Sequence, residues 1–370
     1  MLKRLQTLFG GSTATHNAVL LGLEQTFELT PKDTVLQAAL AAGIEFPHHC
    51  TVGTCGTCRC RLVEGKVRAV LDFSYTLSAQ ELAQGYILAC QALPKSDLTI
   101  EVELGVAAAH ATENYVGTVA SVAQLTPDIM EMSLALDRPM LYTAGQFAEI
   151  FLPHLERHRS YSFSTACPPD GALAVTFQIR RVAGGAFTEW LFDADHLGEA
   201  LALRAPSGSF WLRPAAAPIV CVAGGSGMAP ILALLEDCLQ RGETRPVTYY
   251  YGARKQTDLY ALERIEALAN RWPTTFDFVP VLSEEPTDSA WQGARGLVSD
   301  QLSAPQRDLN LAEAHCYLCG PPPMIDAALV QLKSNAVPVE NIHYDKFLDA
   351  RQLDQNQPDP NLDSRGGAMP

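Results

Sequence analysis

Four of the ten cysteines lie in one short run, HHCTVGTCGTCRC, at residues 48–60. A thiol can form a disulfide, bind zinc or bind an iron–sulfur cluster, and the spacing of the cysteines discriminates between these uses. Cys50, Cys55 and Cys58 follow the pattern C-x4-C-x2-C, and Cys90 lies further along the chain. This is the spacing of a plant-type [2Fe–2S] cluster, in which one loop supplies three ligands and a distant segment supplies the fourth. We therefore predict a [2Fe–2S] cluster on these four cysteines.

Three other interpretations of this run are weaker. Disulfides are typical of exported proteins, and the start MLKRLQTLFGGSTATH has no apolar stretch long enough for an export signal. Zinc sites favour paired C-x2-C knuckles, and this part of the chain has one C-x2-C. A Rieske centre needs histidine ligands among the cysteines, whereas His48 and His49 both precede the first cysteine. We expect these histidines to form hydrogen bonds or to lie at the surface.

The remaining residues of the loop have structural roles in this interpretation. Cys60 falls where the next strand begins, and the alternation of a strand turns it away from the loop, so we predict that it is not a ligand. Gly53 and Gly56 are expected to take positive φ and to bring the backbone close to the inorganic sulfides. Amide N–H groups there would stabilise an added electron.

A second group of residues suited to redox chemistry lies in RSYSFST, at residues 159–165. The motif R-x-Y-S on a predicted strand resembles the flavin-binding motif of the ferredoxin–NAD(P)H reductase family. The resemblance implies that Arg159 pairs with a flavin phosphate, that Tyr161 packs on the isoalloxazine ring and that Ser162 approaches N5. The chemistry agrees, because a guanidinium fits phosphate, an aromatic ring stacks and a hydroxyl can bond a reducible nitrogen.

Two further segments extend this resemblance. GGAFT stands where the family has a glycine turn and a hydroxyl at a helix start, against the flavin pyrophosphate. The resemblance therefore assigns Gly185, Ala186 and Thr188 to the flavin, and the implied pyrophosphate favours FAD over FMN. APSGSFWL resembles the family's G-P-x-G-x-F segment, with Ala205 in place of the glycine.

A glycine turn in IVCVAGGSGMAPILALL, at residues 219–235, follows a predicted strand and precedes a predicted helix. Glycines let a diphosphate come close, and the helix N-terminus stabilises its charge. The pattern G-G-S-G differs from the G-x-G-x-x-G of a standard Rossmann dehydrogenase and resembles the reductase family's G-G-x-G-x-A-P. The resemblance assigns nucleotide binding to Gly224, Gly225, Gly227 and Pro230.

Two later segments continue the match. YLCGPPPM resembles the family's last-strand C-G-P motif, which places Cys319 beside the nicotinamide and lets Gly320 and Pro321 shape the floor of the site. YDKF resembles the C-terminal segment near the flavin, which implies that Phe347 covers the ring. We expect Ser162 and Cys319 to orient the hydride acceptor and donor, and so to be the catalytic residues.

Arg254, in YYYGARKQTDLY, bears on the choice of nucleotide. An arginine at this strand end can contact a 2′-phosphate, which would indicate NADPH. Strings of the form R-x-x-x-D-L also occur in NADH-using relatives. We therefore favour NADH, with NADPH as the alternative.

The elements that must position the cysteines form a small N-terminal domain. Its pattern is two strands, a helix with Asp33 or Thr34 as N-cap, the cysteine loop, and further strands. RCRLVEGKVRAV is predicted to be a hairpin that turns at Glu64 and Gly65. This succession in under a hundred residues indicates an α+β domain of the β-grasp type.

The rest of the chain predicts two further domains and so a multidomain protein. Short alternating strands indicate an antiparallel β-barrel, and the strand–helix alternation after it indicates an α/β domain with a parallel sheet. The boundaries that we predict are 1–16 for a leader segment, 17–105 for the ferredoxin domain, 106–114 for a linker, 115–214 for the FAD-binding barrel, 215–348 for the NAD-binding domain and 349–370 for a disordered tail.

Composition and charge limit the partners of this chain. Apolar residues make up 47% and charged residues 18%, as in globular proteins. The net charge of −14 argues against nucleic acid and permits a partner with a basic patch. No apolar run is long enough for a transmembrane helix, and we expect a cytoplasmic protein. The pattern of residues 1–16 predicts a short amphipathic helix. It is interpreted either as a frayed terminus or as a segment that docks weakly on a membrane surface or a partner.

The order of the three domains resembles that of the benzoate dioxygenase reductase type, shared with phenol hydroxylase and methane monooxygenase reductases. The resemblance implies an NADH-dependent reductase that passes electrons from NADH to FAD, then to the [2Fe–2S] cluster, and finally to an external terminal oxygenase, either a Rieske dioxygenase or a di-iron monooxygenase. One alternative is a membrane di-iron hydroxylase or desaturase as the partner. A second is a zinc-bearing nucleotide-binding sensor without turnover.

Overall fold

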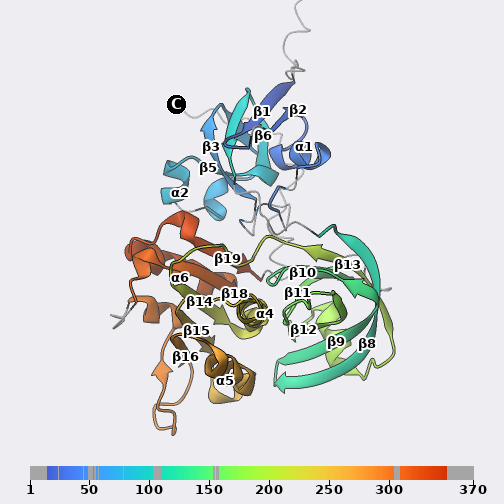
Figure 1. Cartoon of the computed structure of the whole chain (residues 1–370), viewed down its shortest axis with the longest axis vertical. Coiled ribbons are helices and arrows are strands. Elements are labelled where there is room, and N and C mark those ends of the chain that lie inside the picture. Colours follow the sequence, from blue (N-terminus) through green and yellow to red (C-terminus); the bar gives the residue numbers. More distant parts are fainter. Residues whose placement is uncertain are drawn as a thin grey trace, which may run out of the picture. The chain divides into compact units, whose positions relative to one another are not determined.

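The computed structural model divides the chain into two compact units, Met1–Val106 with Ala350–Pro370, and Ala107–Asp349 (Figure 1). The residues that it describes are 15–23, 25–44, 46–48, 53, 56, 58–77, 79–102, 110–152, 155, 158–303 and 309–347. The predicted tail, nearly all of the predicted leader, and the predicted ligands Cys50 and Cys55 lie outside these residues. Within them, no helix is both long and apolar enough to cross a membrane.

The first unit contains a five-stranded sheet of order β2-β1-β7-β3-β5, in which β1 and β7 run parallel and the other pairs run antiparallel. Helix α1 buries Val35 and Leu36 in the core of this unit. Thr34 is its N-cap, and Thr34 and Gln37 form a reciprocal capping box, which decides between the two predicted caps. The elements are β1 (His16–Leu20), β2 (Gln25–Leu29), α1 (Val35–Ala41), β3 (Arg59–Glu64), α2 (Ala79–Ala83), β5 (Tyr86–Leu88) and β7 (Leu98–Glu101).

The predicted hairpin in this unit is wrong. The chain does turn at Gly65, where φ is +99°, but β4 (Val67–Ala69) pairs with β6 (Ala92–Pro94) in a separate two-stranded sheet. The reason is that β3 already pairs with β5 on one edge and with β7 on the other. Its backbone groups are therefore used, and the strand after the turn must find another partner.

The second unit begins with a six-stranded antiparallel sheet of order β11-β10-β13-β8-β9-β12. A bridge between Phe163 and Phe177 joins the two ends of this sheet, and the Ser164 N–H donates to the Thr176 carbonyl at 2.9 Å. The predicted barrel is confirmed, although its first strand begins within the predicted linker. The elements are β8 (Glu113–Thr126), β9 (Ile129–Met140), β10 (Phe147–Phe151), β11 (Arg159–Ser162), β12 (Ala172–Arg180), α3 (Ala186–Asp193) and β13 (Ala200–Ser207).

The second unit ends with a six-stranded sheet of order β17-β16-β15-β14-β18-β19, and every pairing in it is parallel, as predicted. The central strand β14 is fully buried, which accounts for its unbroken apolar sequence. The elements are β14 (Ile219–Gly224), α4 (Met228–Gln240), β15 (Val247–Ala253), α5 (Leu262–Arg271), β16 (Phe276–Leu282), β17 (Ala294–Arg295), β18 (His315–Gly320), α6 (Pro322–Ser334) and β19 (Ile342–Lys346).

Candidate functional site

Two of the four predicted cluster ligands lie within the described residues and face each other. The Sγ atoms of Cys58 and Cys90 are 3.2 Å apart, and both cysteines are buried, with 2% and 5% of their surface exposed. The Cys90 N–H lies 3.5 Å from Cys58 Sγ and donates to it, and Gln91 Nε2 lies 3.8 Å from Cys90 Sγ. Two adjacent buried thiols with N–H donors fit two thiolate ligands of one metal centre.

Two glycines that precede Cys58 lie within the described residues. Gly53 and Gly56 have φ values of +87° and +77°, as predicted. Within the described residues no group of three metal-ligating side chains occurs, because Cys50 and Cys55 are not among them. Cys60 is buried with 1% exposure in the core of the first unit, and this burial raises the pKa of its thiol far above the usual range.

The barrel brings two of the predicted flavin segments together. Tyr161, on β11, packs on Phe187 in the first turn of α3, with ring centroids 4.9 Å apart. Burial raises the pKa of Tyr161, so its hydroxyl stays protonated. Ser162 is buried next to it. The R-x-Y-S strand and the glycine turn, which are distant in sequence, therefore form one surface of the barrel.

Gly185 is the N-cap of α3, at the turn that the resemblance assigns to the pyrophosphate. A side chain on Gly185 would come within 2.8 Å of Thr188 Oγ1 and 3.0 Å of the Val182 carbonyl oxygen. The Thr188 hydroxyl contacts Val182 N at 3.1 Å, Val182 O at 3.1 Å and Gly185 O at 3.0 Å. Thr188 thus fixes the shape of the turn at the N-terminus of α3, where the first backbone N–H groups of a helix have no partner within the helix.

A cavity of about 230 Å³ opens at the carboxyl ends of the parallel strands, where α/β sheets bind nucleotides. It contains four of the residues that the sequence assigned to the nucleotide site, which are Gly224, Gly225, Arg254 and Pro321. The full lining consists of Asp128, Ile129, Arg180, Gly224, Gly225, Tyr251, Gly252, Ala253, Arg254, Asp258, Val281, Ser283, Gly296, Leu297, Val298, Pro321 and Met324. The hydroxyls of Tyr251 and Tyr260 lie 3.3 and 3.1 Å from the Gly225 carbonyl oxygen and hold the turn.

The other predicted nucleotide residues pack behind this cavity. A side chain on Gly227 would come 2.1 Å from the Cys319 carbonyl oxygen, so this glycine lets the start of α4 approach the end of β18. Pro230 is buried in the first turn of α4. Cys319 is fully buried, and this burial, with the nearby Asp345, holds the pKa of its thiol well above the usual range. The Phe347 N–H donates to the Gly320 carbonyl at 2.9 Å.

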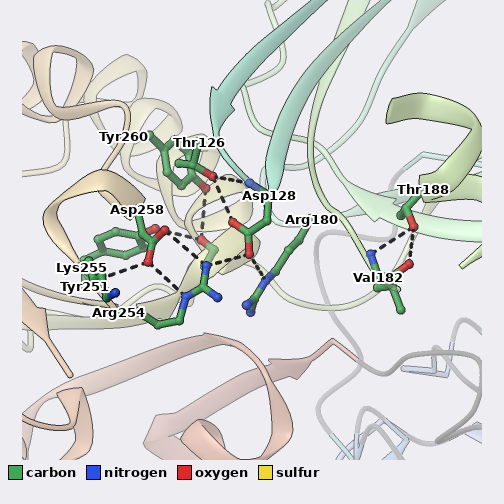
Figure 2. A network of polar contacts seen from close by, with 11 residues as sticks. Thr126, Asp128, Arg180, Val182, Thr188, Tyr251, Arg254, Lys255, Asp258 and Tyr260 are labelled. Carbon is green, nitrogen blue, oxygen red and sulfur yellow. Dashed lines mark hydrogen bonds and ion pairs between the residues drawn. The ribbon is translucent and has the colours of Figure 1, made fainter. Parts of the chain in front are cut away.

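Three charged residues of the cavity wall were not singled out by the sequence patterns. Asp128 accepts hydrogen bonds from Arg180 and Arg254, and Arg254 also contacts Asp258 (Figure 2). The sequence did contain hints of two of these residues. Asp258 is the acidic residue of the R-x-x-x-D-L string, and Arg180 lies next to Arg181, shortly before the GGAFT turn. Asp128 stands in a Thr-Pro-Asp turn that indicates only a turn.

A ferredoxin-type sheet with a pair of facing thiols, followed by an antiparallel barrel and a parallel nucleotide-binding sheet, defines an iron–sulfur flavoprotein oxidoreductase. Three domain families match the chain in this order. They are the 2Fe-2S iron-sulfur cluster binding domain at residues 19–95, the oxidoreductase FAD-binding domain at 117–211 and the oxidoreductase NAD-binding domain at 221–329.

Individual relatives match the chain over most of its length. The chain is 40% identical to the xylene/toluene monooxygenase electron transfer component XylA of Pseudomonas putida, over 87% of this chain and 90% of XylA. It is 36% identical to the phenol 2-monooxygenase reductase component DmpP of Pseudomonas sp. (strain CF600), over 91% and 95%. A crystal structure of the Amycolatopsis cytochrome P450 reductase GcoB superposes with a TM-score of 0.67 at 33% identity, covering 90% of this chain and 98% of GcoB. The chain belongs to this family of NAD(P)H-dependent reductase components of oxygenase systems.

Proposed function

We propose that this protein takes electrons from NADH and delivers them one at a time, through FAD and a [2Fe–2S] cluster, to a terminal monooxygenase that acts on an aromatic compound. When bound, FAD accepts a pair of electrons, and the cluster supplies single electrons to the oxygenase. The observation that carries the proposal is the pair of facing buried thiols, Cys58 and Cys90, on the same chain as the barrel and the nucleotide cavity. The choice of an aromatic substrate is supported by the names of the two relatives.

In this proposal the barrel residues hold the flavin. Arg159 neutralises a phosphate, and Tyr161, fixed by Phe187, supplies an aromatic face for the isoalloxazine ring. Ser162 offers its hydroxyl to the reducible nitrogen. Gly185, whose own N–H donates to the Val182 carbonyl at 2.8 Å, shapes the turn together with Thr188. The Ala186 N–H binds the pyrophosphate at the N-terminus of α3.

The α/β residues bind and orient NADH in this proposal. Gly224 and Gly225 let the diphosphate approach the start of α4, and Gly227 keeps that helix close to β18. Cys319 stays protonated and presents a neutral thiol beside the nicotinamide. Nothing in this scheme needs a strong general base, because the transferred group is a hydride.

Four further residues surround the nicotinamide and the flavin in this proposal. Gly320 and Pro321 shape the floor under the nicotinamide, Pro230 supports the first turn of α4, and Phe347 covers the flavin ring. The four ligands of the cluster are Cys50, Cys55, Cys58 and Cys90. We place the protein in the cytoplasm, with a weak contact of residues 1–16 to a membrane surface.

The matched pair Cys58→Ser and Cys60→Ala tests this proposal. Both positions are buried thiols of the same unit, but only Cys58 faces Cys90. Because one-electron transfer to cytochrome c needs the cluster, Cys58→Ser should lower NADH-dependent cytochrome c reduction by at least about tenfold. Ferricyanide reduction, which the flavin carries out alone, should stay within about twofold of the wild type in both variants.

Two results would contradict the assignment. The first is an equal response of both acceptors to Cys58→Ser, which would remove the cluster from the electron path. The second is a colourless preparation that contains zinc in place of iron and flavin, which would favour the nucleotide-binding sensor. Absorption spectra and metal content of the purified full chain measure this directly, before any variant is made.

A further inference from the structure

One carboxylate joins two arginines at the wall of the nucleotide cavity. Asp128 Oδ2 lies 3.0 Å from Arg180 Nε and 3.0 Å from Arg254 Nη2. Asp128 stands in the turn between β8 and β9, Arg180 ends β12, and Arg254 directly follows β15. Figure 2 shows both guanidinium groups converging on this carboxylate from the barrel and from the parallel sheet. All three residues line the cavity.

Asp128 is fixed by its own surroundings. Its Oδ1 accepts a hydrogen bond from the Thr126 hydroxyl at 3.1 Å, and its backbone N–H donates to Thr126 Oγ1 at 3.3 Å. Its carbonyl accepts from the Arg181 N–H at 2.7 Å, and its side chain is 23% exposed. The position of this carboxylate is therefore determined by the turn and does not depend on a bound nucleotide.

Arg254 also pairs with a second carboxylate, that of Asp258, so the positive and negative charges of the cavity wall balance. Its Nε lies 3.1 Å from Asp258 Oδ2. Burial alone would lower the pKa of Arg254, but the hydrogen bond to Asp258 and the charge of Asp128 raise it on balance, so Arg254 stays charged. Two arginines and two aspartates thus give the wall a net charge near zero.

Asp128, Arg180 and Arg254 lie where the adenosine ribose of a bound dinucleotide is expected. In nucleotide-binding α/β sheets the diphosphate lies at the first glycine turn, and the ribose lies at the end of the following strand. There an acidic residue accepts a hydrogen bond from the 2′-hydroxyl, or an arginine donates to a 2′-phosphate. Here these positions are Gly225 and the end of β15. A side chain on Gly225 would come 3.5 Å from Arg180 Nη1, so the arginine bridged by Asp128 lies beside the glycine turn.

We propose that Asp128, a residue of the barrel, determines the preference for NADH over NADPH by occupying the guanidinium groups of Arg180 and Arg254. With both arginines bridged, a 2′-phosphate meets a carboxylate instead of an available cation, whereas a 2′-hydroxyl can donate to that carboxylate. This inference rests on the proposed function, because it assumes that the cavity binds a nicotinamide dinucleotide.

The test is Asp128→Asn in the full holoenzyme, with ferricyanide as acceptor and NADH and NADPH as donors. Removing the carboxylate charge should raise the ratio of kcat/KM for NADPH to that for NADH by at least about tenfold. Glu236→Gln is the matched control. Glu236 also reaches the barrel, accepting from the Ala166 N–H at 3.3 Å, and it pairs with Arg264, but it does not line the cavity. Its ratio should equal that of the wild type.

A double variant distinguishes the loss of the Asp128 charge from a general loosening of the packing around it. Asp128→Asn/Arg254→Ala should return the ratio toward the wild-type value, because the gain requires the released arginine. An unchanged ratio in Asp128→Asn, or an equal gain in Glu236→Gln, would overturn the inference. Failure of the proposed function would look different, because the wild type would then reduce ferricyanide with neither nucleotide.

A measurement on the wild type covers the case in which Asp128→Asn does not fold. The fragments 5′-AMP and 2′,5′-ADP should inhibit NADH-dependent ferricyanide reduction competitively. We expect 2′,5′-ADP to inhibit no more tightly than 5′-AMP, because the extra phosphate finds no available cation. Clearly tighter inhibition by 2′,5′-ADP would overturn the inference.

Discussion

The buried cysteines of this protein differ in role because their surroundings differ. Cys58, Cys60 and Cys90 all belong to the core of the first unit. The Sγ atoms of Cys58 and Cys90 lie 3.2 Å apart, whereas Cys60 is a buried residue of β3. Cys319 is a third case, a fully buried thiol at the end of β18 whose raised pKa keeps it neutral. A pair of adjacent thiols with N–H donors suits a metal centre, whereas a single buried thiol is inert.

Cys319→Ala should lower kcat for NADH-dependent ferricyanide reduction by about tenfold, which corresponds to about 1.4 kcal/mol of lost orientation at the nicotinamide. Cys316→Ala is the control, because it removes the same atoms from the same strand but belongs to a different core cluster. Both variants should lose similar free energy of unfolding, about 1 kcal/mol, measured by thermal unfolding. If kcat falls equally in both, Cys319 acts only through packing.

At the scale of elements, the nucleotide site depends on how closely one helix approaches one strand. The start of α4 and the end of β18 touch through backbone atoms at Gly227 and Cys319, and no side chain fits between them. The Tyr251 and Tyr260 hydroxyls fix the Gly225 carbonyl from β15 and from the segment before α5. The glycine pattern therefore reflects helix–strand packing as well as room for the diphosphate.

Gly227→Ala should destabilise the α/β sheet by about 1–3 kcal/mol and raise the KM for NADH, because the new methyl group collides with the Cys319 carbonyl oxygen. The flavin content of the purified protein should not change, since the barrel is untouched. Gly242→Ala is the control, just beyond the other end of α4. The new Cβ would have no atom within 4 Å, but an alanine is strained at the φ of +72° that Gly242 adopts. Thermal unfolding should show a smaller loss there, about 1 kcal/mol, and the KM for NADH should stay at the wild-type value. A raised KM in both variants would refute the packing argument.

At the scale of the whole molecule, the second unit joins its barrel to its parallel sheet by polar contacts. Arg264 donates to the Ser164 carbonyl, and the Tyr260 hydroxyl lies 3.1 Å from Gln178 Oε1. Asp128 and Arg254 form a third contact at the cavity. Contacts of this kind fix the position of the flavin-binding barrel relative to the nucleotide-binding sheet. Hydride transfer requires such a fixed position, because the reacting atoms must be held close together.

The predicted leader, residues 1–16, combines basic and leucine side chains. Full-length protein should co-sediment weakly with anionic phospholipid vesicles, because Lys3 and Arg4 attract the surface while Leu2, Leu5 and Leu8 insert. A variant that begins after residue 16 should remain in the supernatant while keeping its ferricyanide reductase activity. Equal sedimentation of the two proteins would remove the proposed membrane contact.

The order of domains, the antiparallel barrel and the parallel sheet followed from local signals in the sequence. Strand alternation, helix caps and glycine turns involve residues that are neighbours in the chain, so their pattern survives without a structure. The capping box at Thr34 and the positive φ of Gly53 and Gly56 are of this kind. The spacing of Cys50, Cys55 and Cys58 is likewise a property of one loop.

Only the tertiary structure decided which distant groups meet. The strand after Gly65 pairs with β6 because both edges of β3 are taken, and no local signal records that. Asp128 looks like an ordinary turn residue until folding places it between Arg180 and Arg254. Sequence determines the conformations that neighbouring residues prefer, whereas charge pairing and edge pairing depend on contacts between segments that lie far apart along the chain.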